Sequence, residues 1–132
     1  MIVPQISLEE AWETLNQDKE SVLVDVRTTA EWAFAGIPDL SSIRKDVRFV
    51  EWIRFPDGER NEDFLADVTQ GLKKDQVVLL LCRSGARSNA AAALLAEEGY
   101  EVANIGSGFE GDLTPGGHRH GGWKDALPWV QS

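Results

Sequence analysis

The run of apolar residues from Val77 to Leu81 places the strongest restriction on how this chain can fold. A strand without polar alternation is buried on both faces, and such strands are typical of the centre of a parallel sheet. Parallel neighbours need long crossover connections, which are usually helices. Strand and helix patterns alternate along the rest of the chain, so we predict an α/β layered fold with parallel strands.

Shorter patterns before this run predict a helix, a strand and a second helix, in that order. Ser7 and Glu10 have the spacing of a capping box, and apolar residues follow them at helical spacing. Residues 22–26 (Val-Leu-Val-Asp-Val) are typical of a short buried strand. Thr29 is expected to cap a short helix that continues through Trp32 and ends before Pro38.

The remaining patterns complete the predicted order of elements. Asn61 is expected to cap a helix with one apolar face, made of Phe64, Leu65, Val68 and Leu72. A helix that begins at Arg87 or Ser88 and ends at Glu98 follows the central strand, and residues 102–105 form another strand. Seven of the 12 glycines lie in residues 106–122, which we interpret as a loop able to form one rim of a site. Residues 123–129 are expected to form a short closing helix or turn. Because we find neither a repeat nor a linker, residues 1–132 are predicted to form a single domain.

Charge and hydropathy exclude several classes of partner. The chain has 13 basic and 22 acidic residues and a net charge of −9, which repels the phosphate backbone of nucleic acids. The same charge favours a basic protein as a partner. The first residues lack the pattern of a signal peptide, and no apolar run is long enough to cross a bilayer. We therefore expect a protein that does not bind membranes. A single cysteine permits no disulfide within the chain, which predicts a location in the reducing cytoplasm.

That cysteine, Cys82, directly follows the central strand, at the edge of the sheet where parallel folds place their ligand sites. The next helix directs its unpaired N–H groups and its dipole toward the same loop, which favours an anion there. Gly85 permits backbone angles that turn the loop N–H groups inward, and Arg83 and Arg87 add positive charge. These features favour a reactive thiolate at Cys82, whereas a buried, inert thiol is the alternative.

The segment Cys82-Arg83-Ser84-Gly85-Ala86-Arg87-Ser88 resembles the active-site loop of the rhodanese family, in which Cys-Arg-x-Gly-x-Arg precedes a serine and an alanine-rich helix. The resemblance extends to residues 25–27, 31–32, 37–38 and 106–109, and therefore spans almost the whole chain. Gly36 is a departure, because family members often carry a histidine there, and no role of that histidine is carried over. The resemblance implies a three-layer rhodanese-like fold, in which helices flank a mostly parallel sheet of about five strands.

The resemblance also implies a thiosulfate sulfurtransferase that works through a persulfide on Cys82. Thiosulfate or a persulfide would donate the sulfur, and a thiol or cyanide from outside the chain would accept it, in two half-reactions with ping-pong kinetics. The rest of the loop would bind the substrate, namely Arg83, Ser84, Gly85, Ala86, Arg87 and Ser88. The resemblance implies no metal and no organic cofactor.

Two alternatives to this function differ in the loop or in the acceptor. Cysteine-dependent phosphatases and arsenate reductases of the same fold have loops similar to Cys-x5-Arg. In this chain Cys82 and Arg87 enclose only four residues, and this smaller loop suits one sulfur atom better than a phosphate. A persulfide carrier would instead deliver its sulfur to one dedicated partner protein. Since the chain has no second cysteine, the acceptor is external in either case.

The other conspicuous residues are interpreted as structural. Asp25 and Arg27 follow a strand end, where we expect them to bind the turns that hold the Cys82 loop. Three aromatic residues are assigned to packing, namely Trp32, Trp52 and Phe109. His118 and His120 have no companion cysteine, which favours a solvated loop over a metal site.

Overall fold

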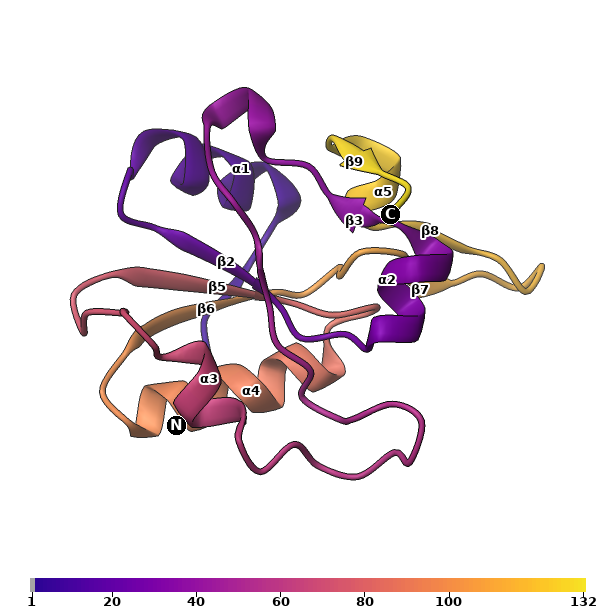
Figure 1. Ribbon diagram of the computed structural model, residues 1–132. Helices are drawn as coiled ribbons and strands as arrows, with labels where there is room; N and C mark the ends of the chain where they lie inside the picture. The colour runs from indigo at the N-terminus through magenta and orange to yellow at the C-terminus, as the bar shows by residue number, and fades with distance from the viewer. Residues whose placement is uncertain (1) are drawn as a thin grey trace.

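A computed structural model describes residues 2–132 and contains a five-stranded sheet in which every pair of neighbours is parallel (Figure 1). The strand order across the sheet is β1-β6-β5-β2-β4. The strands are β1 (Gln5–Ile6), β2 (Val22–Asp25), β4 (Arg48–Phe49), β5 (Val77–Leu81) and β6 (Glu101–Ile105). Strand β5 lies in the centre and is almost wholly buried, as its apolar sequence predicts.

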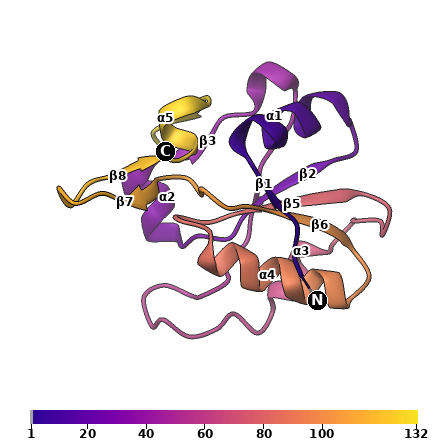
Figure 2. The same ribbon diagram turned by 180° about the vertical axis from the view of Figure 1, so that it is seen from behind.

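Helices cover both faces of this sheet, which confirms the predicted three-layer α/β fold (Figures 1 and 2). Helix α1 (Leu8–Gln17) lies on one face, and α3 (Phe64–Val68) and α4 (Ala86–Glu97) lie on the other. Alternate residues of β5 belong to two apolar clusters, one beside α4 and one beside α1. None of the helices in residues 2–132 has both the length and the apolar character needed to cross a membrane.

Apart from one short 3-10 helix, the remaining elements gather beyond the carboxyl ends of the central strands, around the loop that contains Cys82 (Figure 1). Helices α2 (Thr29–Ala35) and α5 (Trp123–Ala126) lie there. Two small antiparallel sheets join them, made of β3 (Ile37–Pro38) with β9 (Trp129–Val130) and of β7 (Gly111–Leu113) with β8 (Arg119–Gly121). A short 3-10 helix, η1 (Ser41–Ile43), follows β3.

The starts of two helices differ from the sequence prediction by about one residue. Helix α2 is capped by Thr28 rather than Thr29, because the capping box needs a Glu three residues after the cap. The Thr28 hydroxyl accepts the N–H of Glu31, and the Glu31 carboxylate accepts the N–H of Thr28, both at 3.3 Å. Helix α4 begins at Ala86, one residue before the earlier of the two predicted starts.

The prediction that Asn61 caps a helix is wrong. Its side-chain oxygen accepts the N–H of Asp63 at 3.0 Å, which stabilises a local turn, and α3 begins only at Phe64. The helix also ends at Val68, so Leu72 lies beyond it, although Leu72 still packs against the core. The apolar spacing therefore predicted the buried side chains better than the length of the helix.

Residues 106–122 are more ordered than the predicted loop, because they contain the paired strands β7 and β8. The pairing joins Gly111 to Gly121 and Leu113 to Arg119. Glycine is depleted in strands, so a glycine-rich composition conceals a short hairpin of this kind.

Candidate active site

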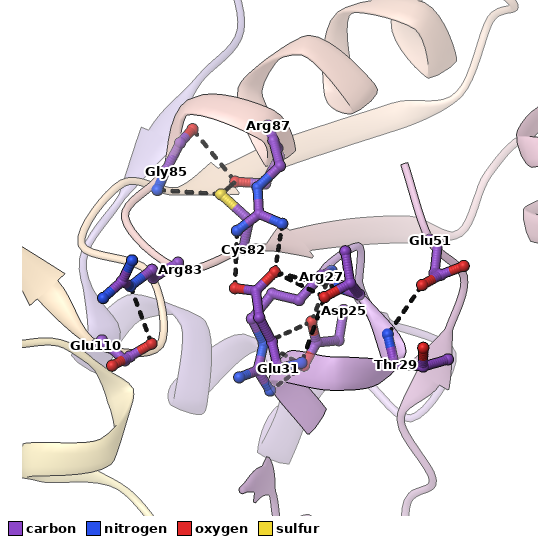
Figure 3. A network of polar contacts seen from close by, with 12 residues as sticks. Asp25, Arg27, Thr29, Glu31, Glu51, Cys82, Arg83, Gly85, Arg87 and Glu110 are labelled. Carbon is purple, nitrogen blue, oxygen red and sulfur yellow. Dashed lines mark hydrogen bonds and ion pairs between the residues drawn. The ribbon is translucent and has the colours of Figure 1, made fainter. Parts of the chain in front are cut away.

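Cys82 follows the last residue of β5 and is buried, with 1% of its surface exposed. The N–H of Gly85 donates to its Sγ at 3.1 Å, so the loop curls back over the sulfur (Figure 3). The hydroxyl of Ser88 lies 3.2 Å from the same sulfur. Two polar hydrogens can therefore reach Sγ, one from the loop and one from the first turn of α4.

The loop is held by the segment that follows β6. The carbonyl of Cys82 accepts the N–H of Phe109 at 2.8 Å, and the carbonyl of Arg83 accepts the N–H of Glu110 at 3.0 Å. Gly85 has a φ of +102°, in the left-handed region that favours glycine. A Cβ at Gly85 would lie 2.4 Å from the carbonyl oxygen of Gly106, so no larger residue fits without displacing the loop.

Helix α4 begins directly at this loop and leaves N–H groups near the sulfur. The first hydrogen bond of the helix runs from the Asn89 N–H to the Gly85 carbonyl, at 3.1 Å. The N–H groups of Ala86, Arg87 and Ser88 come before it and have no place in the helical ladder. They and the helix dipole favour negative charge at this end of the helix.

The two loop arginines are both paired with carboxylates, which the sequence did not indicate (Figure 3). Arg87 forms two hydrogen bonds with Glu31 of α2, at 2.6 and 2.9 Å. Arg83 pairs with Glu110 at 3.1 Å. The hydrogen bonds that Arg87 donates to Glu31 raise the pKa of Arg87, so Arg87 remains charged. The arginines therefore form fixed walls of the site rather than two unpaired cations.

A cavity of about 550 Å³ opens beside the loop. Its lining residues are Ala30, Glu31, Phe34, Ala35, Arg83, Arg87, Glu110 and Lys124. Three of these side chains are cationic and two are anionic, so the cavity is locally positive although the chain carries a net charge of −9. A ligand that enters this cavity meets both arginines of the loop.

Of the loop residues that the sequence singled out, the structure places Cys82 and Ser88 together and buried, with Gly85 between them. Ser84 is half-buried in the loop, whereas the side chain of Ala86 is exposed. Two residues behind the sulfur were missed, Asn104 and Gln5. A buried polar residue inside the apolar strand β6 was the available signal for Asn104.

Asp25 and Arg27 form a wholly buried ion pair with an N–O distance of 2.7 Å. Arg27 also donates to the carbonyl of Gly36 at 2.9 Å and stacks on the ring of Phe109, 4.1 Å from its centroid. Because the Phe109 N–H holds the carbonyl of Cys82, this pair supports the loop, in agreement with the structural role expected for it. A Cβ at Gly36 would lie 2.6 Å from the ring of Trp129, which explains why this chain has no side chain there.

The remaining candidates are two tryptophans and two histidines, which make no hydrogen bond to the sulfur of Cys82 among residues 2–132. Trp32 packs against Phe49, and Trp52 packs against Phe64, with edge-to-face geometry in both pairs. The histidines belong to the β7–β8 hairpin, and residues 2–132 contain no group of three side chains that could hold a metal ion.

The Arg87–Glu31 pair gives the stability of the protein a specific pH dependence. Burial raises the pKa of Glu31, but the hydrogen bonds and charge of Arg87, with the bonds to Thr28, outweigh it and lower that pKa below its usual value of 4.5. A lowered pKa means that the pair stabilises the fold fully above pH 4.5 and progressively less as the pH falls below it. We expect Glu31→Gln to lower the free energy of unfolding by about 1 kcal/mol at pH 7.

Urea unfolding of both proteins at several pH values measures this difference. It should shrink toward zero in acid, and a difference that grows below pH 4.5 would contradict the assigned charge state. Glu110→Gln is the matched control, because its partner Arg83 is half exposed and the expected loss is smaller.

Comparisons with known proteins agree with this geometry. The sequence model of the family described as "Rhodanese-like domain" matches residues 7–113. The uncharacterized protein RC0915 of Rickettsia conorii is 39% identical over 131 residues, which cover 98% of each chain. A sulfurtransferase of Allochromatium vinosum is 32% identical over 109 residues, which cover 82% of this chain and 86% of that protein. The crystal structure of Rv0390 from M. tuberculosis has a TM-score of 0.91 and 43% identity, with 100% of both chains covered. The fold, the sequence of the loop and these matches together show that the chain belongs to the rhodanese-like domain family.

Proposed function

We propose that this sulfurtransferase-type enzyme carries sulfane sulfur as a persulfide on Cys82 and transfers it to an external thiol or to cyanide. The observation that carries the proposal is the position of Sγ, which receives the Gly85 N–H at 3.1 Å and lies 3.2 Å from the Ser88 hydroxyl. A terminal sulfur added to Cys82 would extend toward N–H groups of the loop and of the first turn of α4. Donors arranged in this way stabilise a negatively charged sulfur.

The first half-reaction is a displacement at sulfur. The Cys82 thiolate attacks the outer sulfur of thiosulfate with its electron pair, a new S–S bond forms, and sulfite leaves with the electrons of the broken S–S bond. A persulfide donor would react in the same way and release its thiol. This step needs no added oxidant or reductant, because the S–S bond that breaks in the donor is replaced by the S–S bond that forms at Cys82.

The second half-reaction returns the cysteine. A thiolate or cyanide attacks the terminal sulfur, and the Cys82 thiolate leaves. The loop residues that we propose to bind the substrate are Arg83, Ser84, Gly85, Ala86, Arg87 and Ser88. Arg87 and Arg83 would orient an anionic donor from the cavity wall, while Gly85 and the helix start hold the sulfur.

A persulfide carrier for a protein acceptor is the second candidate. Phe34 lines the cavity and is 85% exposed, so this large apolar side chain packs little against the rest of the chain. Exposed apolar surface of this kind is typical of sites that bind another protein. A protein that covers Phe34 could place its own thiol in the cavity. Sulfur uptake by Cys82 without turnover on small thiols or cyanide would favour this candidate over the first.

Steady-state rates test the small-molecule reaction. With thiosulfate and cyanide both varied, we expect parallel lines in double-reciprocal plots, as ping-pong kinetics require. Intersecting lines would contradict a mechanism in which sulfite leaves before cyanide binds to the enzyme that carries the persulfide. Cys82→Ser should show no rate above the uncatalysed reaction. An aryl phosphate should not be hydrolysed faster by the wild type than by Cys82→Ser, because the four-residue loop is too short for a phosphate.

A further inference from the structure

Behind the sulfur of Cys82, away from the cavity, lies a chain of polar side chains from three elements. The Ser88 hydroxyl of α4 is 2.6 Å from Oδ1 of Asn104 in β6 and 3.2 Å from Sγ. Nδ2 of Asn104 donates to Oε1 of Gln5 in β1 at 2.8 Å, and to the Gly85 carbonyl at 3.1 Å. Ser88 and Asn104 are both buried. Their hydrogen bonds therefore have no competition from bulk water.

The orientation of the Asn104 amide follows from its partners. The carbonyl of Gly85 can only accept a hydrogen bond, so the atom that faces it must be the amide nitrogen. Oδ1 must then face Ser88, and Oδ1 can also only accept. In the observed arrangement, Ser88 is thus the donor to Asn104 at 2.6 Å, whereas its hydroxyl lies 3.2 Å from both Sγ and the Gly85 carbonyl oxygen.

Ser88 has one hydrogen, but two acceptors need it when Cys82 is ionised. While Cys82 is a thiol, its S–H can donate to the Ser88 oxygen, and Ser88 donates to Asn104, so every group is satisfied. When the S–H proton leaves to solvent, the sulfur anion needs a donor. Ser88 can turn its hydrogen to Sγ only by leaving the buried Oδ1 of Asn104 without a partner, which is unfavourable.

We propose that Asn104 is a positioning residue that sets the reactivity of Cys82 by competing with the sulfur for the hydrogen of Ser88. The inference rests on the proposed role of Cys82 as the nucleophile. Asn104 favours the thiol, whereas Gly85 and the start of α4 favour the thiolate. The same competition applies to any negatively charged sulfur that Cys82 carries.

The charged groups around the sulfur come from other elements and are kept unchanged in the test below. They are Arg87 of α4, its partner Glu31 of α2, and Asp25 of β2 with its partner Arg27. Arg83 and Glu110 flank the loop on its other side. Because every variant below retains all of these charges, their effect on the pH profile cancels in each comparison.

The test is the rate of Cys82 alkylation by iodoacetamide, measured against pH, in a double-mutant cycle of Asn104→Leu and Ser88→Ala. Leucine has the branched shape of asparagine, with two methyl groups in place of the amide oxygen and nitrogen, and cannot compete for the hydrogen. With Ser88 present, we expect Asn104→Leu to lower the midpoint of the pH profile by about one pH unit, since a hydrogen bond to a charged group changes an ionisation equilibrium about tenfold. Ser88→Ala alone supplies the reference midpoint for the second half of the cycle.

The cycle separates competition for Ser88 from a general change in polarity. In the Ser88→Ala background, Asn104→Leu has no hydrogen to release, so the downward shift should vanish. A downward shift of equal size in that background would overturn the proposal, as would an unchanged or raised midpoint with Ser88 present. Gln5→Ala is the matched control, because it removes the neighbouring bond of Asn104 and leaves Oδ1 facing Ser88, and its midpoint should equal that of the wild type.

Two safeguards keep the result interpretable. Circular dichroism reports whether Asn104→Leu is folded, and Asn104→Ala repeats the comparison if it is not. Alkylation needs no sulfur donor, so a failure of this inference is distinct from a failure of the proposed function. A protein that shows the predicted shifts but takes up no sulfur would support the role of Asn104 and contradict sulfur transfer.

Discussion

Gly85→Ala should lower the rate of sulfur transfer by at least about 100-fold, because small displacements of a reacting group have effects of that size. The new Cβ would lie 2.4 Å from the carbonyl oxygen of Gly106, a backbone atom that cannot move without moving β6. The φ of +102° adds strain for any residue with a Cβ. Relief of both would pull the Gly85 N–H away from Sγ, where it now donates at 3.1 Å.

Gly58→Ala is the control, because it introduces a Cβ at a positive φ without a collision with neighbouring atoms. Gly58 has a φ of +73°, and a Cβ there would have nothing within 4 Å. This variant should therefore transfer sulfur at the wild-type rate, even if it unfolds at a slightly lower temperature. Steady-state rates measured beside the melting temperatures check both variants. A folded Gly85→Ala protein with nearly full activity would show that the loop geometry does not matter for catalysis.

Asp25→Asn should lower the free energy of unfolding by about 3–5 kcal/mol, the usual cost when one partner of a buried ion pair is removed. The side chains of Asp25 and Arg27 are completely buried, and among residues 2–132 Arg27 forms an ion pair with no other carboxylate. The charge of Arg27 would then remain in the core between Gly36 and Phe109 without compensation. Urea unfolding at neutral pH measures the loss.

The exposed pair of Arg54 and Asp63 provides the control for this change. Its N–O distance is also 2.7 Å, but its side chains are 45% and 71% exposed. Asp63→Asn should therefore cost less than about 1 kcal/mol. Equal losses at the two sites would mean that burial does not determine the importance of the Asp25–Arg27 pair.

The sequence was sufficient to predict the layers of the fold and the position of Cys82. Both depend on local patterns, namely the apolar run Val77–Leu81 and the cysteine and glycine that follow it. A strand apolar on both faces has few places in a fold other than the centre of a parallel sheet. The Ser7–Glu10 capping box is likewise present as predicted, because all of its atoms lie within one helical turn.

The partners of the loop could not be predicted, because they come from distant parts of the chain. Glu31 has the sequence position of a capping-box residue, and nothing near it indicates that its carboxylate also binds Arg87, 56 residues later. Glu110 and Asn104 reach the loop only because β6 pairs with β5. The strand lengths and the hairpin of residues 111–121 depend on pairing in the same way. Local propensity specifies such contacts poorly.

Sulfur uptake by Cys82 is tested most directly by the intact mass of the protein after incubation with thiosulfate. The wild type should gain the mass of one sulfur atom, and cyanide or a thiol should remove it, while Cys82→Ser should gain nothing. An unchanged wild-type mass, or an equal gain by Cys82→Ser, would contradict a persulfide on Cys82.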